Sequence, residues 1–487
     1  MNLPYMTAAT GKNRKQIIAF AGLNYGQGAG DGELAESWGL SSARFPCLSQ
    51  RDGRKTAGTY TSPTGLYARG KLCVVDGTDF LYDGKVVGHV TAGEKQFATI
   101  NTKIVIFPDK VYYDTEAEKF GMLAAEYPGF PGDVTFTANT LTVPEQSYID
   151  QAAENAETKG SVAADTSITA YTGASVNKTT GALTMSGGTA GTPDKLKAGD
   201  YIQYDCDSSK EYMVVQSSAK QSDGTYQITY LLHTAALHKY PGFDELFKAG
   251  DAIEISGCTT CAANNGSHII RSLEARKLTF TKDIFTKTGV EAGTVMLERK
   301  VPDLTCICEC DNRIWGAEGK TIYASALGDP TNFYVYDGVS TDSYAVAVGT
   351  EGEFTGCIAY SSTVLFWKEN CLHKVLGSYP AQYEIYTYTV PGIQKGSEKS
   401  LAVINETLFY KGRNGVYAYS GGTPELLTEN FGTRRFFDAV GGTDGERYYI
   451  SMRTEKGDWE LYVFDTLRAI WPVSYTHLRA HETLSDL

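Results

Sequence analysis

Short apolar runs separated by polar turns recur along most of the chain. One unit occurs six times: a short apolar strand, a turn of Gly, Asn, Asp or other polar residues, and a second strand rich in apolar and aromatic residues. The six segments are LCVVDGTDFLYDG (72–84), IVIFPDKVYYD (104–114), RIWGAEGKTIYAS (313–325), VLFWKENCLHKV (364–375), TLFYKGRNGVYAY (407–419) and RYYISMRTEKGDWELYVFD (447–465). Each unit is typical of a tight β-hairpin.

The spacing of these units predicts how they assemble. Aligning Trp315, Trp367, Tyr410 and Ile450 gives intervals of 52, 43 and 40 residues, and four-stranded propeller blades repeat at about 40 to 50 residues. We therefore predict an all-β fold, a β-propeller in which most Tyr and Trp of the repeats pack between blades. A β-sandwich meander is the alternative, but its hairpins typically recur at shorter intervals.

A long gap interrupts the repeat. The interval from Val75 to Phe107 is 32 residues, whereas the interval from Phe107 to Trp315 is 208, far more than one blade needs. We expect N-terminal blades in 1–125, an inserted β-rich domain in 126–300, and C-terminal blades in 301–472. Two related segments inside the insertion, KAGDYIQYD (197–205) and KAGDAIEIS (248–256), predict two small related β-modules. We expect the insertion and the propeller to unfold separately.

Composition and charge narrow the class of protein. Of 487 residues, 42% are hydrophobic and 12% aromatic, as in a folded β-rich protein, and the net charge is −13. Binding to nucleic acid or to an anionic membrane needs a concentrated Lys/Arg face, and no basic run is longer than NRK (13–15). The chain shows neither a signal-peptide pattern nor an 18-residue apolar run. We therefore expect neither nucleic acid nor membrane as a partner, and assembly in a cytoplasm.

Two groups of cysteines invite a metal hypothesis. Cys258 and Cys261 form CTTC, and Cys306, Cys308 and Cys310 form CICEC, which in a strand would place three sulfurs on one face. A structural zinc site needs four nitrogen or sulfur ligands, and no second CxxC or His pair lies at the usual distance. The cysteines are therefore interpreted as reduced, small core residues. We predict no metal, no cofactor and no loss of stability on chelation.

Enzyme motifs do not emerge from the sequence. The glycine-rich GLNYGQGAGDG (22–32) is not followed by a helix pattern, and DCDSSKE (205–211) lacks the glycine and distal glutamate of a calcium loop. SQRDGRKT (49–56) approaches the Asp box of sialidase-like propellers, but Ser49, Asp52, Gly53 and Thr56 do not hold its spacing and no Trp follows. No catalytic residue is assigned, although a spatial pair of carboxylates for glycan hydrolysis stays open among 57 Asp and Glu.

Two longer stretches resemble a known group of proteins. DGELAESWGLSSARFPCLSQRDGR (31–54) and ERKVPDLTCICECDNRIWGAEGKTIYASALGDPTNFYVYDG (298–338) are similar to segments of large β-propeller proteins encoded in the structural-gene blocks of tailed bacteriophages and Firmicute prophages. The matching residues are 40–42 (LSS), 45–46 (FP), 301–303 (VPD), 312–316 (NRIWG) and 328–330 (GDP). The resemblance covers most of 15–472. It implies a tail or neck component of the virion, and it offers no catalytic residues to transfer.

Taken together, these observations predict a structural component of a phage particle that acts as a rigid scaffold for protein docking. Its partners would be other phage structural proteins, with a second copy of the chain and a host surface glycan left open. One alternative is a propeller of the phage tail that binds or cleaves carbohydrate, marked by exposed Tyr or Trp beside an Asp/Glu pair at one mouth. Another is a cytoplasmic scaffold of the WD40 type, although no Gly-His and Trp-Asp signature recurs.

The last residues differ from the rest of the sequence. VSYTHLRAHET (473–483) fits the in-frame translation of a transposase adapter used in sequencing libraries. We therefore expect residues 473–487 to be non-native and the natural sequence to stop at about Pro472. His477 and His481 would then not be metal ligands. In that case the propeller is incomplete or C-terminally truncated, the ring is open or imperfectly closed near Trp471, and removing 473–487 costs no stability.

Overall fold

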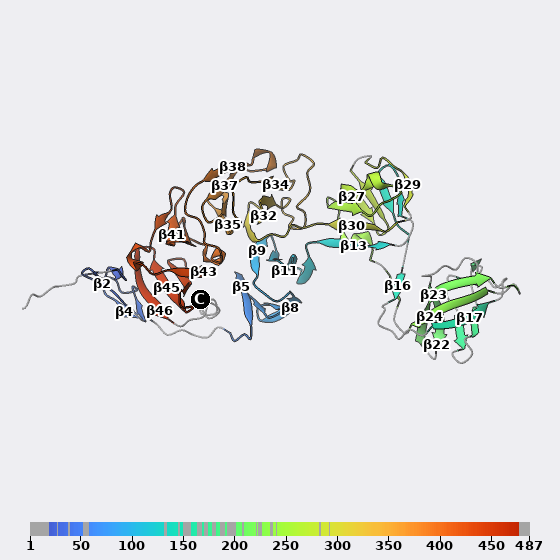
Figure 1. The fold of residues 1–487 in the computed structure, drawn as a ribbon, viewed down its shortest axis with the longest axis horizontal. Coiled ribbons are helices and arrows are strands. Elements are labelled where there is room, and N and C mark those ends of the chain that lie inside the picture. Colours follow the sequence, from blue (N-terminus) through green and yellow to red (C-terminus); the bar gives the residue numbers. More distant parts are fainter. Residues whose placement is uncertain are drawn as a thin grey trace, which may run out of the picture.

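The computed structural model describes residues 19–476, apart from 27, 38, 52–57, 131–133, 145–146, 282–283, 292 and short stretches between 150 and 240. Its described residues form six four-stranded antiparallel sheets of consecutive strands, which are arranged as the blades of a propeller (Figure 1). The predicted all-β propeller is therefore confirmed. No described helix is long and apolar enough to cross a membrane.

The six blades follow one another in chain order, and the strands of each run from the centre of the ring outwards. Blade 1 contains β5 (Pro63–Arg69), β6 (Lys71–Asp76), β7 (Asp79–Tyr82) and β8 (Lys85–His89). Blade 2 contains β9 (Gln96–Ile100), β10 (Lys103–Phe107), β11 (Val111–Asp114) and β12 (Lys119–Met122). Blade 3 contains β31 (Cys306–Cys310), β32 (Arg313–Glu318), β33 (Thr321–Ala324) and β34 (Tyr344–Ala347).

The remaining three blades follow without interruption. Blade 4 contains β35 (Gly356–Tyr360), β36 (Thr363–Trp367), β37 (Leu372–Leu376) and β38 (Glu384–Tyr388). Blade 5 contains β39 (Ala402–Ile404), β40 (Thr407–Gly412), β41 (Gly415–Tyr419) and β42 (Glu425–Leu426). Blade 6 contains β43 (Phe436–Thr443), β44 (Arg447–Thr454), β45 (Trp459–Asp465) and β46 (Ile470–Thr476).

Each predicted hairpin is the middle pair of strands in one blade, and the first strand of every pair has at least three consecutive buried residues. The turn before the middle pair is also encoded locally. In blades 3 to 5 it has two residues with positive φ, which is the conformation of the type I′ turn that matches the twist of a hairpin. The three turns are Asp311 and Asn312, Ser361 and Ser362, and Asn405 and Glu406.

The hydrophobic core of the ring lies between consecutive blades. Five clusters of buried residues each join one blade to the next, from blades 1 and 2 to blades 5 and 6. Trp367 of blade 4, for example, packs against Tyr410 of blade 5 with ring centroids 4.8 Å apart. Among the described residues, no such cluster joins blade 6 to blade 1, although both blades face the centre of the ring.

A short N-terminal segment packs on the last blade. Residues that we assigned to N-terminal blades form β1 (Gly22–Leu23), β2 (Glu33–Leu34), β3 (Leu40–Ser41) and β4 (Ser49–Gln50). Leu23 joins the hydrophobic cluster of blades 5 and 6, which also contains Trp471. Ser42 Oγ donates a hydrogen bond to Asp465 (2.6 Å), and Ser37 Oγ donates one to the carbonyl of Pro472 (2.8 Å). The edge of the last blade is thus covered near Trp471.

The insertion leaves and re-enters the ring at one point, between blades 2 and 3. Ala125 of β13 lies opposite Arg299 of β30 in an antiparallel pair. The first domain of the insertion is an eight-stranded sheet that curls around a single hydrophobic core. The strands are β13 (Ala125–Phe130), β30 (Val295–Arg299), β26 (Ala252–Ser256), β27 (Gly266–Glu274), β28 (Lys277–Phe280), β15 (Thr140–Thr142), β14 (Val134–Phe136) and β29 (Gly289–Glu291), and the helix α1 (Phe243–Leu246) precedes β26.

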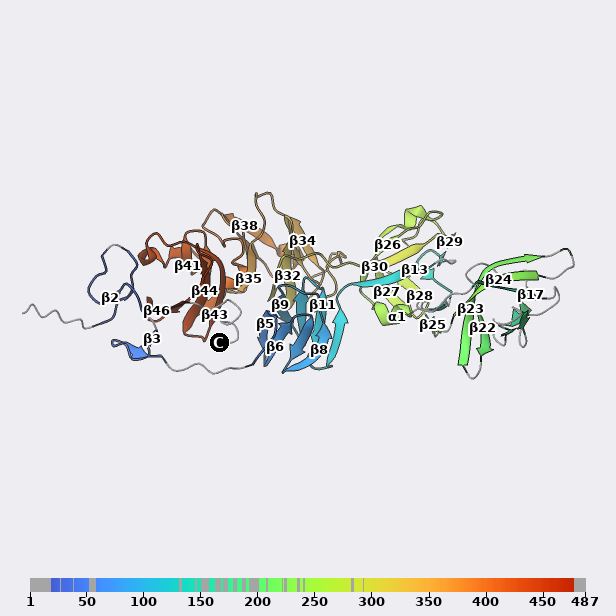
Figure 2. The same cartoon turned by 60° about the horizontal axis from the view of Figure 1, so that its bottom comes forward.

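A second domain is inserted into the first, and Figures 1 and 2 show propeller, first domain and second domain following one another along the long axis. The connection is the pair β16 (Ser147–Ile149) and β25 (Leu237–Lys239). The second domain contains a six-stranded sheet and one separate strand pair. The sheet is β17 (Glu157–Val162), β24 (Tyr226–His233), β23 (Ser209–Lys220), β22 (Tyr201–Cys206), β19 (Ala174–Asn177) and β20 (Ala182–Met185), and the pair is β18 (Ile168–Thr169) with β21 (Ala190–Gly191).

The two KAGD segments precede equivalent strands in different domains. The first precedes β22 of the second domain, and the other precedes β26 of the first domain. Each of these strands pairs antiparallel with the strand that follows it. At the other end of the chain, residues 473–476 continue β46 and pair with β45. Residues 477–487, with His477 and His481, lie outside the described residues.

A buried polar cluster fixes the first inserted domain to blade 3. Arg299, at the end of β30, forms an ion pair with Asp251 and donates hydrogen bonds to the carbonyl of Leu123 (3.1 and 3.2 Å). Asn332, in the loop between β33 and β34, donates a hydrogen bond to Asp251 (2.8 Å) and accepts one from the backbone of Ala252 (3.2 Å). Because Asp251, Arg299 and Asn332 are all buried, this clamp holds the insertion in a defined position.

Candidate functional site: a central cavity and an arginine-lined groove

The cysteines singled out in the sequence lie in structural positions. Cys258 and Cys261 flank a turn held by the buried carboxylate of Glu291, which accepts hydrogen bonds from Thr259 Oγ1 (2.9 Å) and the backbone of Thr260 (3.0 Å) and Cys261 (2.7 Å). Burial raises the pKa of the Cys258 thiol to about 11, helped by the charge of Glu291. The Cys258 thiol is therefore protonated at neutral pH in this structure.

The three cysteines of β31 lie together in the hydrophobic cluster between blades 3 and 4, beside Cys357 of β35. Burial first of all, and then hydrogen bonds with Cys306 and Cys308, raise the pKa of Cys357 well above its ordinary value. No group of three or more His, Cys, Asp or Glu in the described part of the chain is arranged to hold a metal ion. The thiols of Cys306, Cys308, Cys310 and Cys357 are buried in this cluster and contribute to its packing.

A cavity of about 700 Å³ lies at the centre of the ring. Every blade contributes lining residues, among them Gly65, Phe97, Ile307, Cys357, Leu401 and Val440. Tyr60, Tyr67 and Trp459 also line it, together with the carboxylates of Glu94, Glu398 and Asp438. The cavity thus combines aromatic rings with acidic groups.

Ion pairs occupy two of the three carboxylates in the cavity. Glu94 precedes β9 of blade 2 and pairs with Lys399 of blade 5 (3.3 Å), so the contact spans the ring. Asp438 pairs with Arg453 inside blade 6. Hydrolysis of a glycan needs two carboxyl groups on either side of the scissile bond. These ion pairs do not test such a role, so a carboxylate pair for glycan hydrolysis stays the open alternative that the sequence left.

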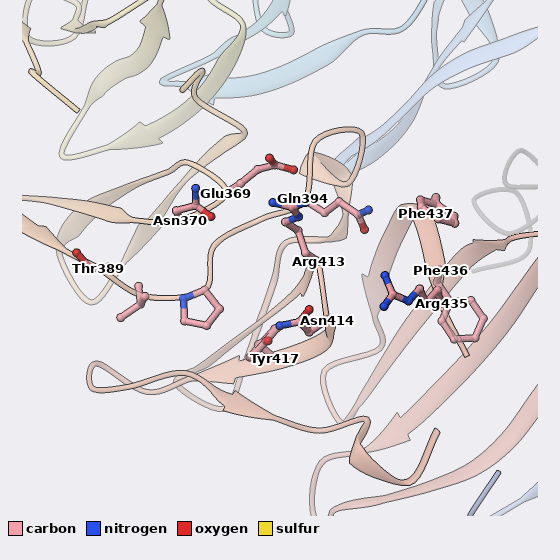
Figure 3. A pocket seen from close by; sticks show the side chains of 12 residues that line it. Glu369, Asn370, Thr389, Gln394, Arg413, Asn414, Tyr417, Arg435, Phe436 and Phe437 are labelled. Carbon is pink, nitrogen blue, oxygen red and sulfur yellow. The ribbon is translucent and has the colours of Figure 1, made fainter. Parts of the chain in front are cut away.

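A second hollow, the arginine groove, lies on the side of the ring formed by the turns of blades 4 and 5 and the segment before blade 6 (Figure 3). It consists of two adjoining pockets of about 550 and 300 Å³. Both pockets are lined by Arg413 and Asn414 of the β40–β41 turn, and by Arg435 and Phe436 at the start of β43. Figure 3 shows Arg413 beside Gln394 on one side and Arg435 beside Phe437 on the other.

The blade architecture explains how these residues meet. Gly412 pairs with Gly415, so Arg413 and Asn414 form the tip of the hairpin. Glu369 and Asn370 occupy the corresponding turn of blade 4, between β36 and β37. The chain then passes from one blade to the next beside these tips. Arg413 and Arg435 therefore come together although 22 positions separate them in the sequence.

A buried lysine supports the floor of the groove. Lys411 donates a hydrogen bond to Gln394 Oε1 (2.8 Å) and another to the carbonyl of Gly412. Burial lowers the pKa of Lys411 to about 8, because the charged amine loses hydration. The lysine thereby fixes the amide of Gln394 with its NH2 group available. The neighbouring Arg434 has its own partners within the protein. Its Cζ lies 3.6 Å from the ring centroid of Tyr25, and its Nη1 lies 3.8 Å from Oε2 of Glu460.

The two groove arginines are free to bind. Arg413 and Arg435 are exposed, and neither forms a hydrogen bond, ion pair or ring contact with the described residues. Glu369 is the acidic residue of the lining. In a chain with a net charge of −13, the groove is a local excess of positive charge. Sequence reasoning missed it because Arg413 has the appearance of a turn residue and RR (434–435) is too short to mark a basic patch.

Comparisons with known proteins give little guidance. No protein-family model matches the chain, and no curated protein does. Among solved structures, the chain is similar to PorZ, a bacterial surface component of the type-IX secretion system of Porphyromonas gingivalis. The identity is 8%, the match covers 86% of this chain and 75% of that chain, and the TM-score is 0.18. This likeness carries no argument about function.

Proposed function

We propose that the chain is a structural component of a phage particle, associated with the tail or neck, that acts as a rigid scaffold for protein docking. The observation that carries this proposal is the clamp of Asp251, Arg299 and Asn332, which fixes the inserted domains to blade 3. A buried pair that is fully hydrogen-bonded favours one arrangement of its neighbours. A scaffold needs such an arrangement, because docking surfaces must stay at fixed positions.

The use of charged groups supports the same role. Lys95 and Asp109 form a buried ion pair (2.6 Å) within blade 2, and the buried carboxylate of Glu291 holds a turn. These charged groups have their partners within the protein and hold neighbouring segments in place. The assignment to a phage rests on the resemblance of 31–54 and 298–338. Other structural proteins of the particle would be the partners, and the virion would be the location.

Purified particles provide the test. We expect mass spectrometry of particles from the source host to detect this chain in a fixed ratio to the capsid protein, and cryo-electron microscopy to place a propeller with a lateral arm near the neck or tail. A chain that occurs in the host extract and is absent from intact particles would contradict the proposal. Portal, capsid and tail genes beside its gene would support it.

Glycan binding is the second candidate, since Tyr60, Tyr67 and Trp459 line the central cavity. Aromatic faces stack on sugars, and one buried ring supplies a large apolar contact. The test is a glycan array with the purified chain, together with an assay for reducing ends released from host surface polysaccharide. Binding that is lost in Trp459→Ala favours this candidate, and release above a heat-killed control favours an enzyme. Neither result is expected from a docking scaffold.

A further inference from the structure

We infer that the arginine groove binds an extended acidic segment of a partner protein, with carboxylates held by Arg413 and Arg435. The inference deepens the docking role proposed above and rests on it only in taking a protein as the partner. Guanidinium groups bind carboxylates through two parallel hydrogen bonds, so each free arginine provides a directional site for one acidic side chain.

The shape of the groove favours a peptide over a small anion. Two pockets of about 550 and 300 Å³ adjoin at the residues they share. An isolated phosphate fills only a small part of such a space, whereas several consecutive residues of an extended chain fill both pockets. The two arginines then contact different side chains of the same segment.

The rest of the lining suits a peptide backbone. Asn370 and Asn414 present side-chain amides that can donate and accept hydrogen bonds, and Gln394 presents the NH2 group that its bond with Lys411 leaves available. Val390 and Phe437, the latter 39% exposed, add apolar surface at the rim. Amides that bind main chain, arginines that bind side chains and an aromatic contact are the usual parts of a peptide-binding surface.

The positive charge of the groove favours a negatively charged partner. The whole chain has a net charge of −13, so its overall field disfavours an acidic segment, and the two arginines attract one at the groove. Because the arginines are exposed, salt screens the attraction, and binding must weaken as the ionic strength rises. A basic or neutral segment of the same length gains nothing from Arg413 and Arg435.

The experiment uses the full chain and a fluorescent ten-residue peptide of alternating Glu and Leu, with the matching Lys–Leu peptide and inorganic phosphate as further probes. Fluorescence anisotropy at low salt is expected to show binding of the Glu peptide alone. Arg413→Gln and Arg435→Gln should each weaken it roughly tenfold, as for a residue at the centre of an interface. Arg271→Gln, which changes an exposed arginine on β27, is the matched control and should have no effect.

The alternative results separate the explanations. Phosphate that binds as tightly as the Glu peptide, with the same dependence on both arginines, would replace the inference by a small-anion site. Absence of binding, or an equal loss in Arg271→Gln, would overturn it. Circular dichroism of each variant shows whether the fold is kept. If the groove binds the peptide while the chain is absent from phage particles, the phage assignment fails and the peptide site stands.

Discussion

At the scale of single residues, buried charges in this protein stabilise particular connections. Glu291 holds the turn of Cys258 and Cys261, and Asp251 and Arg299 hold the insertion against blade 3. Each charge has hydrogen-bond partners that compensate for the lost hydration. Losing one partner therefore costs more than the contact itself contributes, since the other is left buried and unpaired.

Glu291 should make stability depend on pH. Burial by itself would raise its pKa, but hydrogen bonds from Cys261, Thr260 and Thr259 outweigh burial and lower the pKa to about 2. Because the pKa is lower in the folded than in the unfolded state, this contribution is present above the unfolded value near 4.5 and is lost as the pH falls towards 2. It is on the order of 3 kcal/mol.

The measurement is urea unfolding of the wild type and Glu291→Gln at pH 7 and pH 3. We expect the variant to be less stable at pH 7 and the difference to shrink at pH 3. Glu274→Gln, an exposed change on the same domain, should leave both values unchanged. A constant difference between the two pH values would show that the charge of Glu291 does not contribute.

The clamp gives a second prediction at this scale. Asp251→Ala leaves Arg299 buried without its acidic partner, and breaking a buried ion pair in this way costs about 3 to 5 kcal/mol. We expect a loss of this size in the free energy of unfolding of the first inserted domain. Glu298 lies on β30 beside Arg299, is 44% exposed and pairs with Lys300. Glu298→Ala should therefore cost less than about 1 kcal/mol. Equal losses would indicate that Asp251 is not essential to the clamp.

At the scale of elements, the blade is the repeating unit and its stability lies at the contacts between blades. Trp367 in β36 is fully buried against Tyr410 and Tyr419 of blade 5, with ring centroids 4.8 and 5.6 Å apart. The aligned aromatic positions of the sequence thus mark surfaces that join neighbouring blades. A change at one such position should weaken two blades at once.

Replacing Trp367 by Ala should destabilise the protein by about 3 to 5 kcal/mol, because a large cavity forms in a packed interface. Trp367→Phe keeps most of the contact and should cost less. Trp459→Ala is the control, since that ring lines the central cavity and is only partly buried. Thermal unfolding followed by circular dichroism ranks the variants, and a Trp459→Ala as unstable as Trp367→Ala would disprove the assignment.

The middle hairpins could be predicted because the first strand of each has a run of buried residues and the turn is local. The outer strands could not: β42 has two residues, and β38 exposes Tyr386 and Tyr388. The arginine groove could not be predicted from the sequence. Arg413 and Arg435 come together only in the folded ring, and no local sequence pattern marks their proximity. The two KAGD strands were expected to belong to two small related modules, and they lie in two different sheets. The β16–β25 connection that separates the two domains could not be predicted, because such distant pairings leave no short-range signal.

At the scale of the whole molecule, the insertion is joined to the ring at one place. Ala125 and Arg299 lie opposite each other, so the chain returns to its starting point. We therefore expect the ring to fold without the segment that lies between them. Replacing 125–299 by two glycines, a length that closes an antiparallel pair, should leave a folded propeller. All five tryptophans lie outside the replaced part, at positions 38, 315, 367, 459 and 471.

Tryptophan emission therefore follows the unfolding of the part of the chain outside the insertion, which contains the ring. We expect the shortened chain to keep the emission maximum and the unfolding midpoint of the full chain. In the full chain, circular dichroism should show a further transition that the emission does not follow, because the inserted domains have their own core. A shortened chain with the emission of unfolded protein would show that the ring needs the insertion to fold.

The single attachment point has a consequence for assembly. Six blades of similar shape could dock on a ring of partners in six rotations that differ little in energy. The inserted domains, fixed to blade 3, make one of these rotations distinct. Only in that rotation do they reach the partner surface that binds them. By fixing the inserted domains to blade 3, the clamp of Asp251, Arg299 and Asn332 would thus set the rotational orientation of the propeller on its partners.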